Sequence, residues 1–136
     1  MTPQEQARAR LDAFQAALGR LVSALSQPKS EWTRDAAIQR FEFTFELAWK
    51  NLMHAVRAEG LECASPRQAF RAALSLGWIA DEEVWLDMLE DRNRTSHTYE
   101  EATAEEIYAR LRTYADALGT LLRLLRTKAP GTAEST

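Results

Sequence analysis

The residues best suited to chemistry lie close together late in the chain, between Arg92 and Tyr99. An arginine guanidinium can hold a phosphate through two parallel hydrogen bonds. A histidine imidazole can give or take a proton near pH 7. Arg92 and His97 therefore supply the minimum set of groups for cleaving RNA without a metal ion. The same pair can also simply bind a nucleotide.

The positions of Arg92 and His97 on a helix decide whether one chain can bring them to the same atom. Five residues turn an α-helix by about 500°, so these two side chains point about 140° apart. Asn93 and His97 are four residues apart and share a face. Either the helix loosens before His97, which Thr95 and Ser96 permit, or two copies of the chain form a composite cleft. We favour a homodimer as the more economical answer.

Helices are expected to position these residues, because apolar side chains recur at three- and four-residue spacing along most of the chain. Ser65, followed by proline, and Asp81 are expected N-caps, and Thr103 with Glu106 forms an expected capping box. Gly60 is a stop signal. The five predicted helices run from about residue 3 to 27, 33 to 59, 65 to 77, 81 to 97 and 103 to 128.

The second predicted helix carries two conflicting periodicities. Large apolar residues alternate with polar or small ones from Phe41 to Trp49, which is strand spacing. The uninterrupted segment is about 25 residues long, however, and this is far too long for a strand. As a helix, it has one apolar stripe for the core, and Phe43 and Leu47 begin a second. A helix that is apolar on two sides is either buried between neighbours or lies at a subunit interface.

These segments predict an all-α fold, an up-and-down four-helix bundle with an extra short helix, which dimerises. Residues 1–128 are expected to form a single helical-bundle domain, and residues 129–136 a disordered tail. No apolar run approaches the roughly 20 residues that span a bilayer. With one cysteine and no signal-peptide pattern, the expected location is cytoplasmic.

Negative charge is concentrated around the candidate site. The chain has a net charge of −3, but from Asp81 to Glu106 ten acidic residues face two arginines, a local net of −8. Such a surround repels a polyanion. Any RNA would therefore have to be short, be steered by another surface, or be presented by a partner.

Other polar residues have ordinary structural explanations. His54 is expected to be a packed core histidine, and Glu42 and Glu46 to lie on a helix flank where Lys50 can pair with them. The histidines and carboxylates give no case for a metal site, and no cofactor is expected. Five residues are interpreted as a solvated face: Glu90, Asp91, Arg94, Glu100 and Glu101.

Three segments resemble one known family. Residues 88–99, Met-Leu-Glu-Asp-Arg-Asn-Arg-Thr-Ser-His-Thr-Tyr, are similar to the signature of HEPN-domain proteins. More narrowly, they resemble the nucleotidyltransferase substrate-binding subgroup. Residues 41–50 are similar to that subgroup's second helix and Ser65-Pro66-Arg67 to its third. The likeness covers about residues 8–125 and keeps the order of the segments.

The resemblance implies a function and roles for particular residues. HEPN domains usually dimerise, and many are metal-independent RNases encoded beside a minimal nucleotidyltransferase, as toxin and antitoxin. By resemblance, Arg92 would hold the scissile phosphate and His97 would act as general base or acid on the 2′-hydroxyl. Asn93 and Ser96 would support or bind in the cleft. Tyr99 occupies the position that the partner modifies with AMP in one branch of the family.

Two functions therefore follow from the sequence. In the first, the chain is the HEPN component of a toxin–antitoxin pair, a metal-independent endoribonuclease regulated by its nucleotidyltransferase partner. In the alternative, the chain is a non-catalytic adaptor that binds a nucleotide or substrate for that partner. A nuclease needs the His97 imidazole for turnover, whereas an adaptor needs only its shape and hydrogen bonds.

Overall fold

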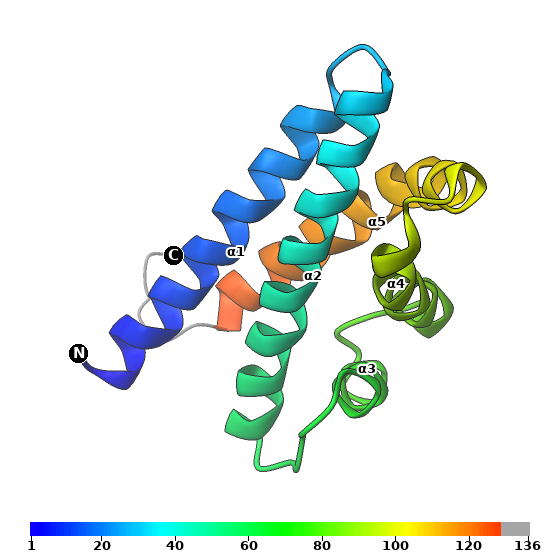
Figure 1. Ribbon diagram of the computed structural model, residues 1–136. Coiled ribbons are helices and arrows are strands. Elements are labelled where there is room, and N and C mark those ends of the chain that lie inside the picture. The colour runs from blue at the N-terminus through cyan, green and yellow to red at the C-terminus, as the bar shows by residue number, and fades with distance from the viewer. Residues whose placement is uncertain (129–136) are drawn as a thin grey trace.

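Six helical elements follow one another in a computed structural model of the protein, which describes residues 1–128 (Figure 1). No strand occurs among these residues, so the predicted all-α helical fold is confirmed. The predicted disordered tail, residues 129–136, lies outside the described part. The elements are α1 (Pro3–Leu25), α2 (Glu31–Ala58), α3 (Pro66–Ser75), α4 (Glu82–Arg94), the 3₁₀ turn η1 (Thr95–His97) and α5 (Glu101–Lys128).

Both expected N-caps, Ser65 and Asp81, are confirmed, and Ser30 caps α2 in the same way. Ser30, Ser65 and Asp81 each accept a backbone N–H of the first turn of α2, α3 and α4. The expected start at Thr103 is wrong, because α5 begins at Glu101. The backbone N–H of Ala104 already donates to the Glu100 carbonyl at 3.1 Å, so the first turn forms before Thr103 is reached.

Two glycines end helices as the sequence predicts. Gly60 follows α2 with φ 86° and Gly77 follows α3 with φ 77°. Only glycine adopts this left-handed conformation without a Cβ penalty, which is why the chain can turn sharply at both points. The turn after Gly60 brings α3 back against α2, and the turn after Gly77 leads into α4.

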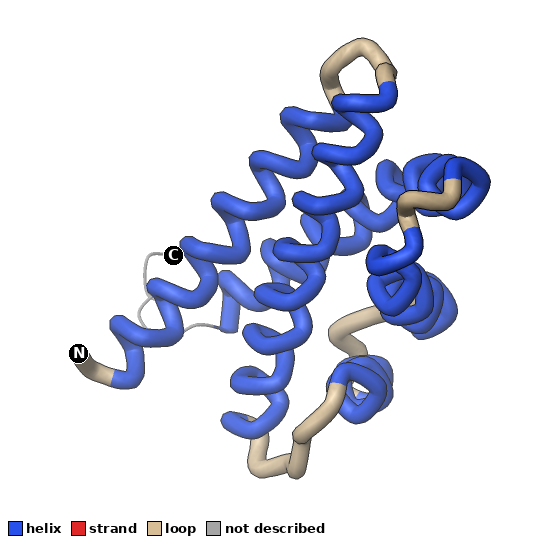
Figure 2. The backbone as a smooth tube through the Cα atoms, in the orientation of Figure 1, coloured by secondary structure: helices blue, strands red, loops and turns tan. Residues whose placement is uncertain are grey.

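The helices surround α2. In Figure 1, α1 and α2 lie side by side as an antiparallel pair and α5 crosses behind them. The short helices α3 and α4 lie on the other side of α2 from α1, and the backbone trace of Figure 2 shows the same order. No helix within residues 1–128 is long and apolar enough to cross a membrane.

Aromatic rings connect the layers of the core. Phe41 of α2 stacks on Tyr114 of α5 with ring centroids 5.4 Å apart, and Phe45 meets Phe70 of α3 at 6.0 Å. Phe70 in turn contacts Trp85 of α4 at 5.3 Å. All five rings are buried, so α2 is fixed against three neighbouring helices. This arrangement positions α4, whose last turn carries the candidate site.

Candidate functional site

The predicted motif forms the end of α4 and the connection to α5. The α-helix stops at Arg94, and Thr95–His97 form a 3₁₀ turn. The Thr95 hydroxyl donates to the Arg92 carbonyl at 2.7 Å, which closes the last helical turn. The helix therefore changes before His97, at the two residues where the sequence permits it.

The change does not bring Arg92 and His97 together. A 3₁₀ helix has 3.0 residues per turn and so advances about 120° per residue, more than an α-helix. His97 is carried further round the axis than an uninterrupted helix would carry it. Arg92 faces α2, whereas the side chain of His97 is exposed. The change in the helix therefore does not bring Arg92 and His97 to one site within a single chain. A site shared by two copies stays a prediction.

Arg92 is held by three neighbours. Its guanidinium lies over the Phe45 ring, 5.1 Å from the centroid, and pairs with the Glu46 carboxylate. Its Nε donates to Asn93 Oδ1 at 3.1 Å, so Asn93 contacts the arginine that it is expected to support. The Arg92 side chain is 24% exposed. Arginine has five donor hydrogens, so donors remain for an anionic ligand.

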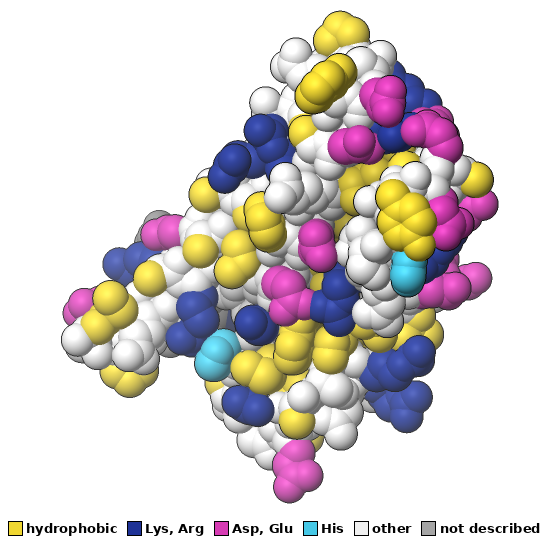
Figure 3. All heavy atoms as spheres, in the orientation of Figure 1, with side chains coloured by type: hydrophobic (Ala, Val, Ile, Leu, Met, Phe, Trp, Pro, Cys, Tyr) yellow, Lys and Arg dark blue, Asp and Glu magenta, His cyan; other side chains and the backbone are white. Residues whose placement is uncertain are grey.

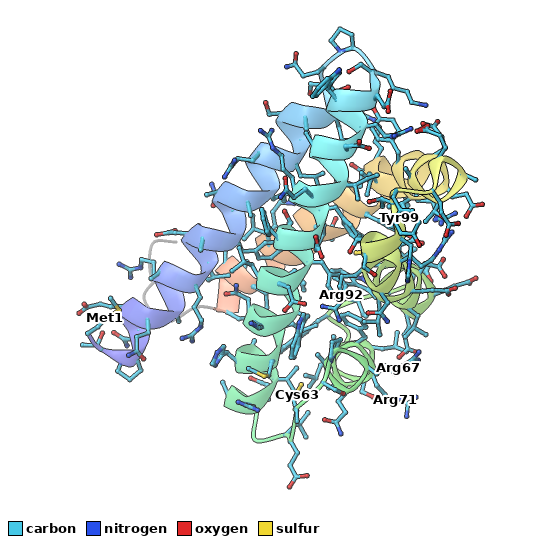
Figure 4. The ribbon with its side chains drawn as sticks, viewed as in Figure 1. Met1, Cys63, Arg67, Arg71, Arg92 and Tyr99 are labelled. Carbon is cyan, nitrogen blue, oxygen red and sulfur yellow. The ribbon has the colours of Figure 1, made fainter. Side chains whose placement is uncertain are left out.

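His97 and Tyr99 form a second, exposed cluster. Their ring centroids are 6.0 Å apart at an interplanar angle of 65°. Tyr99 is 79% exposed, and Figure 4 shows it above Arg92. The backbone N–H of Glu100 donates to the His97 carbonyl at 3.1 Å, which fixes the turn. Within residues 1–128 neither His97 nor Ser96 makes a side-chain hydrogen bond, so both side chains are available to a ligand.

Two carboxylates that sequence reasoning set aside belong to this site. Glu46 pairs with Arg92 and accepts from Trp49 Nε1 at 3.3 Å, while its expected partner Lys50 lies at 3.7 Å. Glu42 accepts the Thr95 hydroxyl at 3.0 Å. The available signal was their spacing of four residues, which puts both on the face of α2 that meets α4 and the turn after it.

The interpretation of Asp91 as part of a solvated face is wrong. Its carboxylate is buried and accepts from Arg110 Nε at 2.7 Å, from the Tyr114 hydroxyl at 2.6 Å and from Arg94 at 3.2 Å. Burial alone would raise the pKa of Asp91, but the hydrogen bonds from Arg110 and Tyr114 outweigh it and hold this pKa below its ordinary value. Asp91 therefore fastens α4 to α5 one residue before Arg92.

Part of the excess negative charge is paired with cations from other helices. The buried Arg34 of α2 donates to Glu101 at 2.6 Å and to Glu105 at 2.9 Å, and these bonds raise the pKa of its guanidinium. Lys29 also pairs with Glu105, and Arg94 pairs with Glu106. These carboxylates anchor the start of α5, so the local charge of −8 is a weaker barrier to RNA than the sequence suggests.

Two cavities of the described residues have volumes of about 260 and 280 Å³, and neither is lined by Arg92 or His97. The second is lined by their neighbours Asp91 and Arg94. His54 lines the first of these, between the ends of α1, α2 and α5, and is only half-buried. It is thus less enclosed than the packed core histidine expected from the sequence.

Comparison with known proteins agrees with this geometry. A family model described as "Nucleotidyltransferase substrate binding protein like" matches residues 9–127. The chain belongs to this family. The predicted resemblance to the HEPN subgroup of nucleotidyltransferase substrate-binding proteins is therefore confirmed.

Individual members of the family are similar along much of the chain. A curated Haemophilus influenzae protein, "Probable ribonuclease HepT", is 33% identical over 95 residues, which cover 66% of this chain and 65% of that protein. A crystal structure of a protein from Thermus thermophilus matches with a TM-score of 0.79 and 43% identity, covering 83% of this chain and 98% of that one.

A second solved structure, from Haemophilus influenzae, has a TM-score of 0.73 and 28% identity, over 85% of this chain and 98% of that one. It is described as revealing the fold of a substrate binding domain of a nucleotidyltransferase. The helical arrangement around the motif is thus that of the family.

Proposed function

We propose that the protein is a homodimeric, metal-independent endoribonuclease in the cytoplasm, paired as toxin with a minimal nucleotidyltransferase as antitoxin. One observation carries the proposal. Arg92 is held with its charge at the surface, and His97 lies in the exposed turn that follows, with no hydrogen-bond partner in the described chain. The match to a probable ribonuclease and to a nucleotidyltransferase's substrate binding domain supports both parts of the pair.

The proposed reaction uses the 2′-hydroxyl of RNA as the nucleophile. His97 takes the proton of this hydroxyl, and the oxygen attacks the adjacent phosphorus while Arg92 neutralises charge on the phosphate oxygens. The bond from phosphorus to the 5′-oxygen breaks, and the second copy's His97 protonates that oxygen. The products are a 2′,3′-cyclic phosphate and a free 5′-hydroxyl. No cofactor is needed, because the nucleophile is internal to the substrate.

A second copy is required by this scheme, since Arg92 and His97 of one chain point away from each other. Two motifs facing across a two-fold axis would place both arginines and both histidines around one strand. Glu46 holds the Arg92 guanidinium in the free protein, and a substrate phosphate would replace part of that contact.

The adaptor function is favoured by one specific feature. The Arg92 guanidinium is paired with Glu46, and an arginine neutralised in this way stabilises developing charge on a phosphate less than a free one would, whereas it can still donate hydrogen bonds to a bound nucleotide. In this second proposal the site binds a nucleotide or substrate, and the partner nucleotidyltransferase carries out the chemistry.

RNA cleavage in EDTA separates the two proposals. The purified chain is compared with His97→Ala and with the matched control His54→Ala, which removes the other imidazole far from the motif. We expect cleavage by the parent chain and the control, 2′,3′-cyclic phosphate ends, and a loss of at least about a hundredfold in His97→Ala. A well-folded dimer that cuts no RNA would contradict the nuclease and favour the adaptor.

The same assay with partner and ATP added tests regulation at Tyr99. An AMP group on the exposed hydroxyl would add bulk and negative charge next to the His97 ring and oppose a phosphate substrate. We expect the parent chain to be silenced and to gain the mass of AMP. Tyr99→Phe should stay active and unmodified, and its full silencing would contradict this switch.

A further inference from the structure

The charges of the protein are segregated along α2 and α3. After Glu46, the rest of α2 and all of α3 contain no carboxylate, but they carry four cations: Lys50, Arg57, Arg67 and Arg71. Figure 3 shows Lys and Arg side chains gathered over α3, whereas Asp and Glu side chains gather toward α4, α5 and the first half of α2. The surface on the α3 side of the motif is therefore basic.

Arg67 and Arg71 of α3 are the free members of this group. Both side chains are exposed and make no ion pair or side-chain hydrogen bond within residues 1–128. They are four residues apart, so they are neighbours on the helix surface and repel each other slightly. Figure 4 shows both extending outward from α3. Two unpaired guanidinium groups side by side are suited to binding successive anionic groups.

The helix α3 packs against α2 and against α4, the helix that carries Arg92. The Arg92 guanidinium lies over Phe45, and Phe45 contacts Phe70 with ring centroids 6.0 Å apart. Phe70 lies between Arg67 and Arg71 in the sequence of α3. Through these two ring contacts, Arg92 is linked to the helix that carries the two free arginines. Arg92 is the residue proposed to hold the scissile phosphate.

We infer that Arg67 and Arg71 bind the phosphates of single-stranded RNA flanking the phosphate held at Arg92. This inference rests on the proposed binding of RNA at the motif and adds the direction in which the strand leaves it. It also answers the repulsion expected from the acidic segment, because the strand is steered over α3, a helix without carboxylates. Phosphate contacts carry no base readout, so this flank contributes affinity and length preference, not sequence specificity.

Arg57 and Lys50 are less suitable as test positions. Arg57 Nε donates to the Cys63 carbonyl at 2.8 Å and thereby fixes the loop between α2 and α3. Lys50 lies 3.7 Å from Glu46. Replacing either would change structure or charge at the motif itself, whereas Arg67 and Arg71 can be removed without losing an internal contact.

The test measures RNA binding in the His97→Ala background, where no strand is cut. The variant is Arg67→Ala with Arg71→Ala, and the control is Arg8→Ala with Arg20→Ala. The control arginines are exposed residues of α1, on the other side of α2, and form no ion pair in the described chain. Fluorescence anisotropy is recorded over a range of salt concentrations with a labelled single-stranded RNA of about 12 nucleotides and with a dinucleotide.

We expect the α3 variant to bind the long RNA about tenfold more weakly, which is about 1.4 kcal/mol. The slope of log K against log salt should fall in magnitude by about 1.4, which corresponds to two phosphates of a single strand. The dinucleotide, too short to reach α3, should bind unchanged. The α1 control should stay within about twofold for both ligands.

The outcomes separate this inference from the nuclease proposal. Equal RNA binding by the α3 variant and the control would overturn the inference that Arg67 and Arg71 bind flanking phosphates, even if the parent chain cuts RNA. If the parent chain never cuts RNA but the α3 variant binds RNA more weakly, the phosphate-binding role of Arg67 and Arg71 is supported and the nuclease proposal is contradicted. Unchanged RNA binding with loss of the nucleotidyltransferase would assign this surface to the protein partner and overturn the inference.

Discussion

Arg92 is the residue whose surroundings say most about the site. A guanidinium over an aromatic face is attracted by the negative face of the ring and is held near it. Phe45 supplies that face, while Glu46 and Asn93 occupy two of the edges. A lysine at this position would offer a mobile point charge instead. The contacts around Arg92 therefore position its guanidinium group before any ligand binds.

Glu46 should weaken the binding of RNA in the free protein, because it competes with phosphate for Arg92. The Glu46 side chain is 36% exposed, so the ion pair contributes at most about 1 kcal/mol. We expect Glu46→Gln to tighten RNA binding by up to about fivefold, measured by anisotropy in the His97→Ala background.

Glu42→Gln is the matched control for Glu46→Gln. It removes the same charge one helical turn away, where the carboxylate accepts the Thr95 hydroxyl and does not pair with Arg92. Its effect should be smaller than about twofold. An equal gain in both variants would show that only the overall charge matters and that Arg92 is not released.

The sequence is informative about which residues form the motif and less informative about what holds them. Arg92 and His97 were proposed from their types and spacing and Tyr99 from the family resemblance, and their roles stay predictions. Glu46 could not be predicted, since an i to i+4 lysine on its own helix offers a simpler partner. Asp91 was misinterpreted for a related reason: charge in a sequence suggests solvent, and the partners that hold its carboxylate lie on α5, about 20 residues later.

At the scale of elements, two clamps define the connection that carries His97. Asp91 joins the end of α4 to Arg110 and Tyr114 of α5, and Arg34 of α2 holds Glu101 at the start of α5. The 3₁₀ turn and the residues after it lie between these two sets of contacts in the sequence. The sequence predicted the helices to within a few residues, but the turn depends on contacts between helices, which periodicity does not contain.

Asp91 should be the most sensitive single position of this connection. Asp91→Asn would leave Arg110 and Arg94 without their buried counter-charge, so we expect a loss of about 3 kcal/mol in the free energy of unfolding. Urea unfolding at pH 7 measures it. Glu90→Gln, an exposed neighbour without a side-chain hydrogen bond in the described chain, should change stability by less than about 0.5 kcal/mol.

The same comparison has a defined pH dependence. Folding lowers the pKa of Asp91 below its ordinary value of 3.8. The stability from the ionised carboxylate is therefore fully present above this pH and is lost as the pH falls through the lower, folded-state value. The difference between the parent chain and Asp91→Asn should shrink as the pH falls through and below the ordinary carboxyl pKa of 3.8. A constant difference would show that the charge is not responsible.

At the scale of the whole molecule, one face carries exposed aromatic residues that a monomer has no reason to expose. Trp32 is 86% exposed and Phe43 is 53% exposed, both on α2, and Tyr99 belongs to the motif. Trp32 and Phe43 are eleven residues apart, which is within about 20° on a helix, so they share a face. Exposed apolar residues gathered in this way usually mark an interface. The second apolar stripe that begins at Phe43 in the sequence lies on this exposed face.

The proposed cleft needs two copies, so it should fail when that face is made polar. We expect Phe43→Asp to convert the dimer to a folded monomer in light scattering and to reduce RNA cleavage by more than about tenfold, because each active centre takes His97 from two chains. Leu61→Asp, which adds the same charge at a residue 43% exposed in the loop after α2, should leave both unchanged. A Phe43→Asp protein that still dimerises would place the interface elsewhere. A parent chain that cuts RNA as a monomer would require Arg92 and His97 to act within one chain, against their directions in this fold.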